Sequence, residues 1–209
     1  MREYWNKRFL SESRIWGDSP SRTAEYAKEL FLRNEVKSIL VPGAGYGRNA
    51  KLFASSGLSV TGIEISDEAL KLARDHASTI VYYQGSVLDM PFSDDRYDAI
   101  YCFNVLHLFR EAERRLFLGK CYDQLNEDGL AFFTVFSEQE SSYGKGCEVE
   151  PNTFESKPGR PVHYFTEDDL LVHFKDFEVV ETGIVEDPED HGDDGPHTHL
   201  VRYIYARRK

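Results

Sequence analysis

Three glycines at alternate positions form the first pattern in the sequence that could do chemistry. Gly43, Gly45 and Gly47, with Ala44 inside the run, follow the apolar segment VKSILVP and precede a helical segment. Glycine allows positive φ angles and lets the backbone approach a ligand closely, so such a loop between a strand and a helix can cradle a bound nucleoside. A tight strand–helix turn without a ligand is the alternative interpretation.

Glu64 favours the ligand-binding interpretation. It ends the β-branched segment SVTGIE, 21 positions after Gly43. Nucleotide-binding α/β folds place a carboxylate there to accept hydrogen bonds from two ribose hydroxyls; an ordinary surface Glu is the alternative. The dinucleotide fingerprint G-x-G-x-x-G would need its third glycine at Arg48, and the spacing here is G-x-G-x-G. The two features predict a nucleoside site and disfavour NAD and FAD.

Histidines near the ends of predicted strands are the candidates for acid–base chemistry. His107 follows the fourth predicted strand, and His163, in RPVHYF, is expected on the same face. His197 and His199 begin the last strand and are placed to reach the rim of the site. An imidazole can take up a proton or position an acceptor near neutral pH. We therefore predict His107 and His163 as catalytic candidates, with structural packing as the alternative for each.

The acidic segment 187–199, DPEDHGDDGPHTH, is rich in residue types that bind metals. Its carboxylates and imidazoles lack the H-x-x-x-H or C-x-x-C spacing of a strong metal site. Such clusters in Gly- and Pro-rich loops are mostly solvated turns. We therefore expect no metal.

Strands and helices alternate along the first two thirds of the chain, which predicts a parallel sheet covered on both faces. The link between the last two strands is too short for a crossover helix, so these strands should pair antiparallel. The predicted fold is α/β, a Rossmann-like three-layer sandwich with a mostly parallel seven-stranded sheet and an antiparallel C-terminal strand. Helices are predicted over 21–34, 48–57, 67–77, 111–125 and 167–174, and strands over 36–43, 59–65, 79–85, 97–106, 130–137, 177–186 and 197–207.

Two segments outside this alternation are expected to cover the site. The N-terminal arm carries Tyr4, Trp5 and Trp16 among charged residues, which favours a short amphipathic helix. Residues 137–163 are polar, Gly- and Pro-rich and aperiodic, which is typical of a long functional or mobile loop. We expect a single domain over 1–209, made of an arm (1–34), a cofactor-binding core (36–137), a cover loop (137–163) and a C-terminal helix and strand pair (164–209).

Composition limits the class of partner. The chain has 209 residues, with 25 basic and 36 acidic side chains, a net charge of −11 (25 − 36). Such a surface repels phosphate backbones and anionic lipid, so we expect neither nucleic acid nor membrane as a partner. The charged N-terminus predicts no signal peptide, and the odd, widely spaced cysteines predict reduced thiols in a cytoplasmic protein. A monomer or homodimer is expected.

Four segments together resemble a known family. VPGAGYGRNAKLF, VTGIEIS, GSVLDMPFSDDRYDAIYCFNVLHL and NEDGLAFFTVF are similar, in order and spacing, to the four core motifs of class I S-adenosylmethionine-dependent methyltransferases. This resemblance covers residues 36–137. WNKRF near the N-terminus and the stretch from PGRPVHYFTEDDLL onward resemble, more loosely, the small-molecule methyltransferases of the tellurite-resistance type.

The resemblance implies roles for individual residues. The glycine loop would pass under the methionine and ribose parts of S-adenosylmethionine, Glu64 would bind the ribose, and Ile65 would pack on the adenine. Ser86 stands where the family often has an acidic residue facing the adenine amino group. This departure leaves Ser86, the Val87 backbone and Asp89 as alternatives for that contact. Phe103 and Asn104 would meet the ammonium group of the methionine part, and Arg48 would meet its carboxylate group. Trp5 would cover the cofactor.

The resemblance implies methyl transfer to a small molecule or small anion, with S-adenosylhomocysteine as the product. This displacement needs alignment of the nucleophile, methyl carbon and sulfur, and it needs a general base only where the acceptor must lose a proton. Two alternatives stay open at this point. One is an NAD(P)-dependent oxidoreductase, and the other is a non-catalytic nucleoside-binding regulator.

Overall fold

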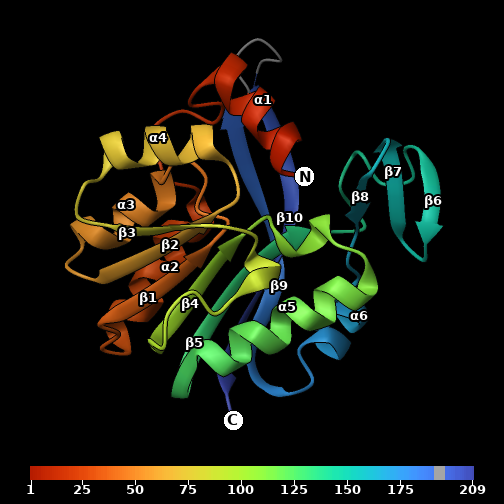
Figure 1. Cartoon of the computed structure of the whole chain (residues 1–209). Helices are drawn as coiled ribbons and strands as arrows, with labels where there is room; N and C mark the ends of the chain where they lie inside the picture. The colour runs from red at the N-terminus through yellow and green to blue at the C-terminus, as the bar shows by residue number, and fades with distance from the viewer. Residues whose placement is uncertain (191–195) are drawn as a thin grey trace.

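The computed structural model describes residues 1–190 and 196–209 of the chain. A seven-stranded sheet in the order β3-β2-β1-β4-β5-β10-β9 forms its centre (Figure 1). The strands are β1 (Ser38–Pro42), β2 (Ser59–Glu64), β3 (Val81–Gln84), β4 (Tyr97–Phe103), β5 (Leu125–Phe136), β9 (Phe177–Asp190) and β10 (Pro196–Arg208). The helices are α1 (Arg2–Glu12), α2 (Arg22–Arg33), α3 (Arg48–Ser55), α4 (Asp67–His76), α5 (Glu111–Gln124) and α6 (Glu167–His173), with single 3-10 turns η1 (Val87–Asp89) and η2 (Leu106–Leu108).

The strand directions confirm the predicted sheet. β1 pairs in parallel with β2 and β4, β2 with β3, and β4 with β5. β10 pairs antiparallel with both β5 and β9 and is inserted between them. Because β1, β2, β4 and β5 are parallel, their carboxyl ends meet at one edge of the sheet.

Local signals set the helix boundaries. The hydroxyls of Ser21, Ser66 and Thr166 accept hydrogen bonds from the backbone N–H three residues on, so each caps the helix that was predicted to begin there. Phe31 of α2 and Phe53 of α3 pack on one face of the sheet, and α5 and α6 bury their apolar residues on the other. The longest described helix, α5, has 14 residues, and no helix in the described ranges has the length and apolar character to cross a bilayer.

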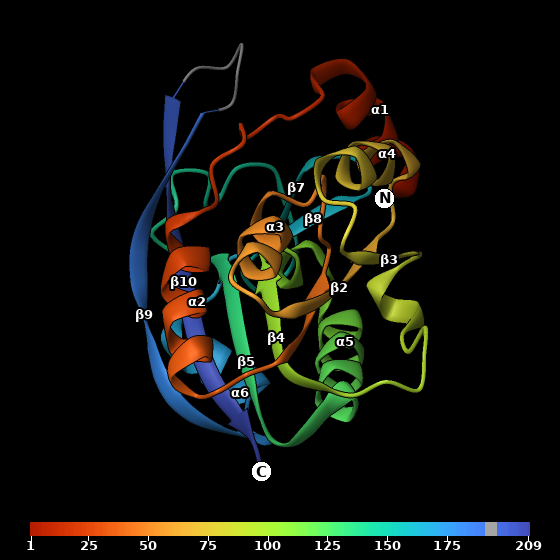
Figure 2. The ribbon, with the colours of Figure 1, turned by 90° about the vertical axis from the view of Figure 1, so that its left-hand side faces the viewer.

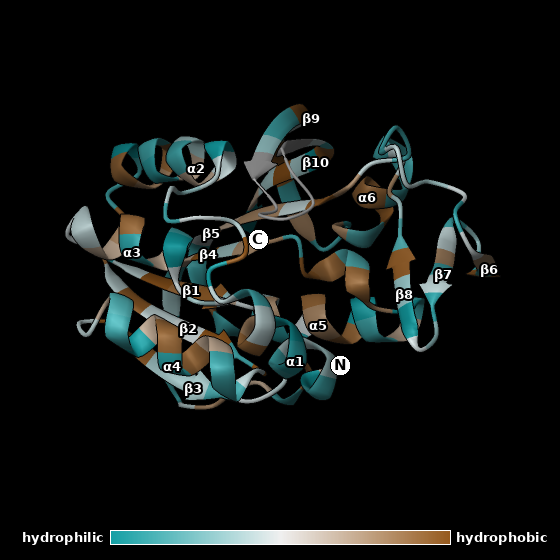
Figure 3. Cartoon of the chain, turned by 90° about the horizontal axis from the view of Figure 1, so that it is seen from above, coloured by the Kyte–Doolittle hydropathy of each residue, from teal (hydrophilic) through white to brown (hydrophobic). Residues whose placement is uncertain are grey.

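The segment predicted as an aperiodic loop, 137–163, instead contains a small antiparallel sheet. Its strands are β6 (Cys147–Glu150), β7 (Thr153–Lys157) and β8 (Arg160–His163). Figures 1 and 3 show this sheet standing at the side of the molecule, beyond α5 and α6. The prediction was wrong because each strand is only four or five residues long and the register shifts within both pairings, which erases a two-residue period in the sequence.

The N-terminal arm forms the predicted helix, α1, which lies against α4 (Figure 2). Arg2 makes a double hydrogen bond to the carboxylate of Asp67, the first residue of α4. The amide of Asn6 accepts a hydrogen bond at 2.7 Å from Ser66, the cap of the same helix. The arm is therefore attached at the residues that follow Glu64 directly.

Candidate active site

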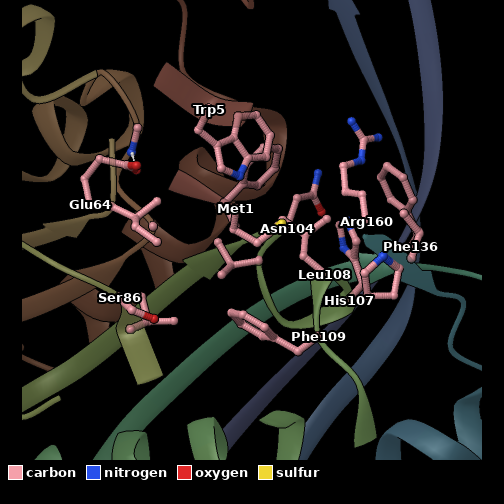
Figure 4. A pocket seen from close by; sticks show the side chains of 18 of the residues that line it. Met1, Trp5, Glu64, Ser86, Asn104, His107, Leu108, Phe109, Phe136 and Arg160 are labelled. Atoms are coloured by element: carbon pink, nitrogen blue, oxygen red, sulfur yellow. Dashed lines mark hydrogen bonds between the residues drawn. The ribbon is translucent and has the colours of Figure 1, made fainter. Parts of the chain in front are cut away.

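A cavity of about 960 Å³ opens at the carboxyl ends of β1, β2 and β4, near the upper end of the usual size of ligand pockets. Figure 4 shows Glu64 and Ser86 at one end and His107, Phe136 and Arg160 at the other. We call these the donor end and the acceptor end. Residues at both ends line the same cavity, so one continuous space connects them. Trp5 of α1 lies between the two ends.

The glycine loop lies at the donor end, and its three glycines have different surroundings. A Cβ atom on Gly43 would clash with Val105 at 2.3 Å, and one on Gly47 would clash with the hydroxyl of Tyr82 at 2.5 Å. A Cβ atom on Gly45 meets only Phe9, at 3.9 Å. All three have positive φ, but only Gly43 and Gly45 line the cavity. Gly47, predicted as a cofactor contact, instead packs against Tyr82 and caps α3.

Glu64 is buried at the end of β2 and lines the cavity. Its Oε2 accepts a hydrogen bond from the N–H of Gly45 and its Oε1 one from the N–H of Ser66, both at 2.8 Å. Burial raises the pKa of this carboxyl, and the backbone hydrogen bonds oppose the rise. A carboxylate has about four lone-pair positions, so two remain for hydroxyl donors of a ligand.

Asn104, at the end of β4, has a left-handed backbone with φ 54°. Its N–H donates to the carbonyl of Thr134 on β5, and the Thr134 hydroxyl donates to the Asn104 side-chain oxygen at 3.0 Å. Positive φ is uncommon for residues other than glycine and is often found at functional sites. Asn104 and its neighbour Phe103 both line the cavity.

Arg48 is buried in the first turn of α3, rather than facing solvent. Its guanidinium lies over the rings of Trp16 and Phe103, at 5.8 and 5.4 Å from their centroids. It also donates to the carbonyl of Trp16 at 3.0 Å. A positive group is thereby fixed in the cavity wall near the glycine loop.

Ile65, Ser86 and Val87 complete the donor end. The hydroxyl of Ser86 accepts from the Leu88 N–H at 3.1 Å and caps η1, so one of its acceptor positions is occupied. Asp89, the alternative partner for an adenine amino group, is not among the residues that line the cavity.

Aromatic residues of the arm cover the cavity. Trp5, Phe9 and Trp16 line it together with Tyr46, whose ring stacks on Trp16 at 6.1 Å. Tyr4 does not line the cavity, but its hydroxyl accepts a hydrogen bond from Arg160 of β8. The arm and the small sheet, both predicted as covers, thus meet at this contact.

The acceptor end is built around Phe136, the last residue of β5. Its ring stacks on His107 at 4.2 Å and on His199 at 5.0 Å, and all three residues line the cavity. Burial, together with the neighbouring His199 and Arg160, lowers the pKa of His107 to about 3. His107 is therefore neutral near pH 7, and its buried Nδ1 has no hydrogen-bond partner among the described residues.

The structure does not bring His163 to the cavity, in contrast to the prediction. Its Nδ1 lies 2.8 Å from the Thr153 hydroxyl and its Nε2 lies 2.6 Å from Asp169, which also bonds His173. Both ring nitrogens are occupied in a buried network that ties β7 and β8 to α6. His199 does reach the cavity wall, whereas the side chain of His197 lies outside what the structure describes.

Sequence reasoning missed several residues of the acceptor end. Phe136 lies inside the apolar predicted strand 130–137 and gives no signal of its own. Arg160 and Glu140 lie in the segment without periodicity, so nothing in the sequence placed them near His107. Tyr46, inside the glycine motif, was omitted although its position carried a signal.

Comparison with known protein families agrees with this geometry. Residues 40–133 match the family model described as "Methyltransferase domain". This stretch of the chain is therefore similar to a methyltransferase domain. The match runs from β1 into β5 and so covers the glycine loop, Glu64 and Asn104, but none of the small sheet or the last two strands.

One curated relative of the chain is a putative methyltransferase of Geobacillus sp. (strain WCH70). It is 30% identical over 139 residues, which cover 64% of this chain and 56% of the relative. Ubiquinone biosynthesis O-methyltransferases match over a similar region, for example that of Actinobacillus pleuropneumoniae serotype 7 (strain AP76), at 28% identity over 51% of this chain and 49% of the relative. The chain thus spans about half the length of the curated relatives it matches.

Solved structures show the same fold at low identity. A structure described as the conversion of a disulfide bond into a thioacetal group during echinomycin biosynthesis has a TM-score of 0.77 at 17% identity, covering all of this chain and 93% of that one. The 1,6-didemethyltoxoflavin-N1-methyltransferase of Burkholderia thailandensis scores 0.73 at 20% identity, with 100% and 87% covered. TehB of Haemophilus influenzae has a TM-score of 0.66 at 16% identity, covering all of this chain and 67% of that one.

Proposed function

We propose that the chain transfers the methyl group of S-adenosylmethionine to a small-molecule acceptor. The observation that carries the proposal is the single cavity that joins the glycine loop and Glu64 to the enclosed aromatic end at His107 and Phe136. A nucleoside-binding regulator needs the first of these ends, but it has no use for a second, connected compartment.

The residues of the donor end fit the methyl donor. A side chain at Gly45 would enter otherwise open space in the cavity, and Glu64 keeps acceptor capacity for two ribose hydroxyls. The guanidinium of Arg48 is the positive group for the methionine carboxylate. The donor supplies an activated methyl group, so this chain has to bind it, align the acceptor and exclude water.

A small acceptor is favoured by enclosure and by charge. The arm and the small sheet close over the acceptor end, where the Tyr4–Arg160 contact joins them. A net charge of −11 disfavours nucleic-acid substrates. The Burkholderia thailandensis neighbour is described with bound 1,6-didemethyltoxoflavin and S-adenosylhomocysteine, which supports a small acceptor and this donor here. We place the reaction in the cytoplasm, because all three cysteines are free thiols.

Titration calorimetry tests the donor. S-adenosylmethionine and S-adenosylhomocysteine should bind with one site per chain, and NADH should not. Binding of NADH alone would refute the proposal in favour of an oxidoreductase. Transfer of radiolabelled methyl to a panel of phenols, amines, thiols and oxyanions tests turnover, and tight binding of the donor without transfer to any of them would favour the regulator.

A further inference from the structure

The wall of the acceptor end includes a guanidinium that has no carboxylate partner. Arg160 is partly buried at the start of β8 and lines the cavity at the same end as His107 and Phe136 (Figure 4). Among the described residues, its hydrogen-bond partner is the hydroxyl of Tyr4, whose ring centre lies 4.7 Å from its Cζ. A guanidinium has about five N–H donors, so most of them have no protein partner here. None of its unpartnered nitrogens is buried, so a ligand can reach them.

Carboxylates of the same wall are directed to other groups. Glu155 of β7 accepts a hydrogen bond at 2.9 Å from Arg110, and Glu140 accepts one at 2.8 Å from the N–H of Leu200. No carboxylate of the described residues lies within ion-pair distance of Arg160. The chain has 36 acidic and 25 basic side chains, so composition alone would not leave an arginine in a cavity without an acidic partner.

The charge of Arg160 acts on the interior of the acceptor end. It is one of the causes that lower the pKa of His107, after burial and the neighbouring His199. Because His107 stays neutral near pH 7, it does not share with Arg160 the role of a cation beside the ring of Phe136.

Rings and apolar side chains form much of the remaining wall. The rings of Phe136 and His107 stack at 4.2 Å with an interplanar angle of 15°. Leu108, Phe109 and Val162 also line the cavity. Such a surface binds a planar ring by stacking and by removing apolar area from water. A carboxylate is the natural partner of a guanidinium, because the two planar groups can form two parallel hydrogen bonds.

We infer that Arg160 determines the specificity for the methyl acceptor and that this acceptor is a small aromatic carboxylate. The guanidinium holds the carboxylate, which is not itself methylated, and the ring of the acceptor lies at the wall formed by Phe136. Tyr4 is a positioning residue, because its hydroxyl and ring hold the guanidinium. The inference rests on the proposed methyl transfer and deepens it by naming the acceptor class. A neutral aromatic acceptor would leave Arg160 unpaired, and a small inorganic oxyanion would leave the aromatic wall unused.

Probes that differ only in charge test this class without turnover. Benzoate and benzamide have nearly the same shape, but only benzoate is charged at about pH 7.5, since carboxyl groups titrate near pH 4. 4-Hydroxybenzoate and 4-hydroxybenzamide form a second pair that carries a hydroxyl nucleophile. Each probe is titrated calorimetrically into protein saturated with S-adenosylhomocysteine, so that a change in donor affinity does not enter the comparison. The Kd of each carboxylate should be roughly 10- to 100-fold lower than that of its amide.

Three variants assign the preference to one side chain. Arg160→Gln should reduce the preference for the carboxylate to less than about twofold and leave binding of the amide nearly unchanged. Arg160→Lys keeps the charge but lacks the planar fork of donors, so it should retain an intermediate preference. Lys157→Gln is the matched control, because Lys157 pairs with Arg160 across β7 and β8, is exposed and does not line the cavity. This control should keep the preference of the wild-type protein.

The outcomes separate the inference from the proposed function. Wild-type protein that does not bind S-adenosylhomocysteine refutes the proposed function. Wild-type protein that binds S-adenosylhomocysteine but binds both members of each pair equally, or neither, overturns the acceptor class alone. Phenyl phosphate that binds more tightly than benzoate would overturn the choice of a carboxylate in favour of a dianion.

The variants decide the role of Arg160 itself. A preference that persists in Arg160→Gln would assign the selectivity to another group. Equal losses for carboxylate and amide in Arg160→Gln would reduce Arg160 to a structural residue. A preference lost equally in Arg160→Lys, or in the control Lys157→Gln, would show that the acceptor does not pair with the charge of Arg160.

Discussion

Replacement of Glu64 by Gln is the sharpest test of the donor end. The change keeps the size of the side chain, but it removes the charge and turns one oxygen into an NH₂ donor. Both carboxylate oxygens now accept backbone hydrogen bonds, from Gly45 and Ser66. In the variant, the NH₂ group of the glutamine must therefore face the backbone N–H of Gly45 or of Ser66, and two donors cannot hydrogen-bond. The ligand also loses a charged acceptor.

The expected loss of affinity can be worked out from these contacts. A hydrogen bond to a charged group contributes about 1.5–3 kcal/mol, and Glu64 has capacity for two from ribose hydroxyls. Gln keeps one carbonyl oxygen, so about one such bond is lost and the other is weakened. We expect a loss of about 2–3 kcal/mol, which is roughly 30- to 150-fold in the Kd of S-adenosylhomocysteine.

Calorimetric titration measures the Kd, and a thermal melt shows whether the variant is folded. Glu68→Gln is the matched control, because Glu68 lies four residues further on, pairs with Lys71 at 2.7 Å and does not line the cavity. Its Kd should equal that of the wild-type protein. A folded Glu64→Gln variant with a Kd within about twofold of wild type would refute the ribose assignment.

Three further predictions concern the loop, the cover and the buried network. Gly45→Asn should weaken S-adenosylhomocysteine binding more than about 100-fold with little change in Tm, because Asn tolerates positive φ and its side chain would fill the cavity. The control Gly57→Asn, which lies at another positive φ but in open space, should bind S-adenosylhomocysteine normally. Normal binding by both variants would show that the glycine loop is only a turn. Hydrogen exchange in residues 1–16 and 137–163 should slow when S-adenosylhomocysteine binds, and exchange that ignores the ligand would contradict their role as covers. Burial alone would raise the pKa of Asp169, but hydrogen bonds from two histidines outweigh it and hold that pKa well below its usual range. This carboxylate therefore stabilises the fold fully above the unfolded pKa of about 3.9, and its contribution is lost as pH falls toward the lower folded value. Urea unfolding should give Asp169→Asn a free energy of unfolding about 1–3 kcal/mol lower than that of the wild-type protein at neutral pH. The difference should be smaller in acid. A difference that does not change with pH would show that the ionisation of Asp169 does not stabilise the fold.

The sheet and its helices could be predicted because their signals are local. Ser21, Ser66 and Thr166 cap helices where the sequence placed them, and apolar runs bounded by turn residues mark the strands. The direction of the last strands followed from the length of their link. The helices and strands depend on residues that are close in the sequence, so short segments of the sequence are enough to predict them.

The donor end was predictable for a related reason. Gly45, Glu64 and Asn104 each lie at the carboxyl end of a strand in a parallel sheet, where topology alone brings them together. Gly47 shows the limit of this reasoning. It shares the motif and the positive φ, but its close neighbour is Tyr82, and a contact from β3 cannot be deduced from spacing.

The acceptor end could not be predicted because long-range packing creates it. His163 and His107 both looked suitable, yet Thr153 and Asp169 occupy both nitrogens of His163. His199 reaches the cavity because β10 inserts beside β5, which places it against Phe136. Residue type alone made these histidines equal candidates for the acceptor end, and only the order of the strands shows which of them line the cavity.

The arm connects the two ends of the cavity through contacts of different strength. At the donor end it is held by Arg2 and Asp67, an exposed ion pair that salt screens and that stabilises little. In its middle, Phe9 is buried among Trp5, Trp16 and Tyr46, and these apolar contacts resist opening. The start of α1 is therefore held by weaker contacts than the Phe9 cluster. Because Tyr4 of α1 also contacts Arg160 of β8, the start of this helix joins the donor end of the cavity to the acceptor end.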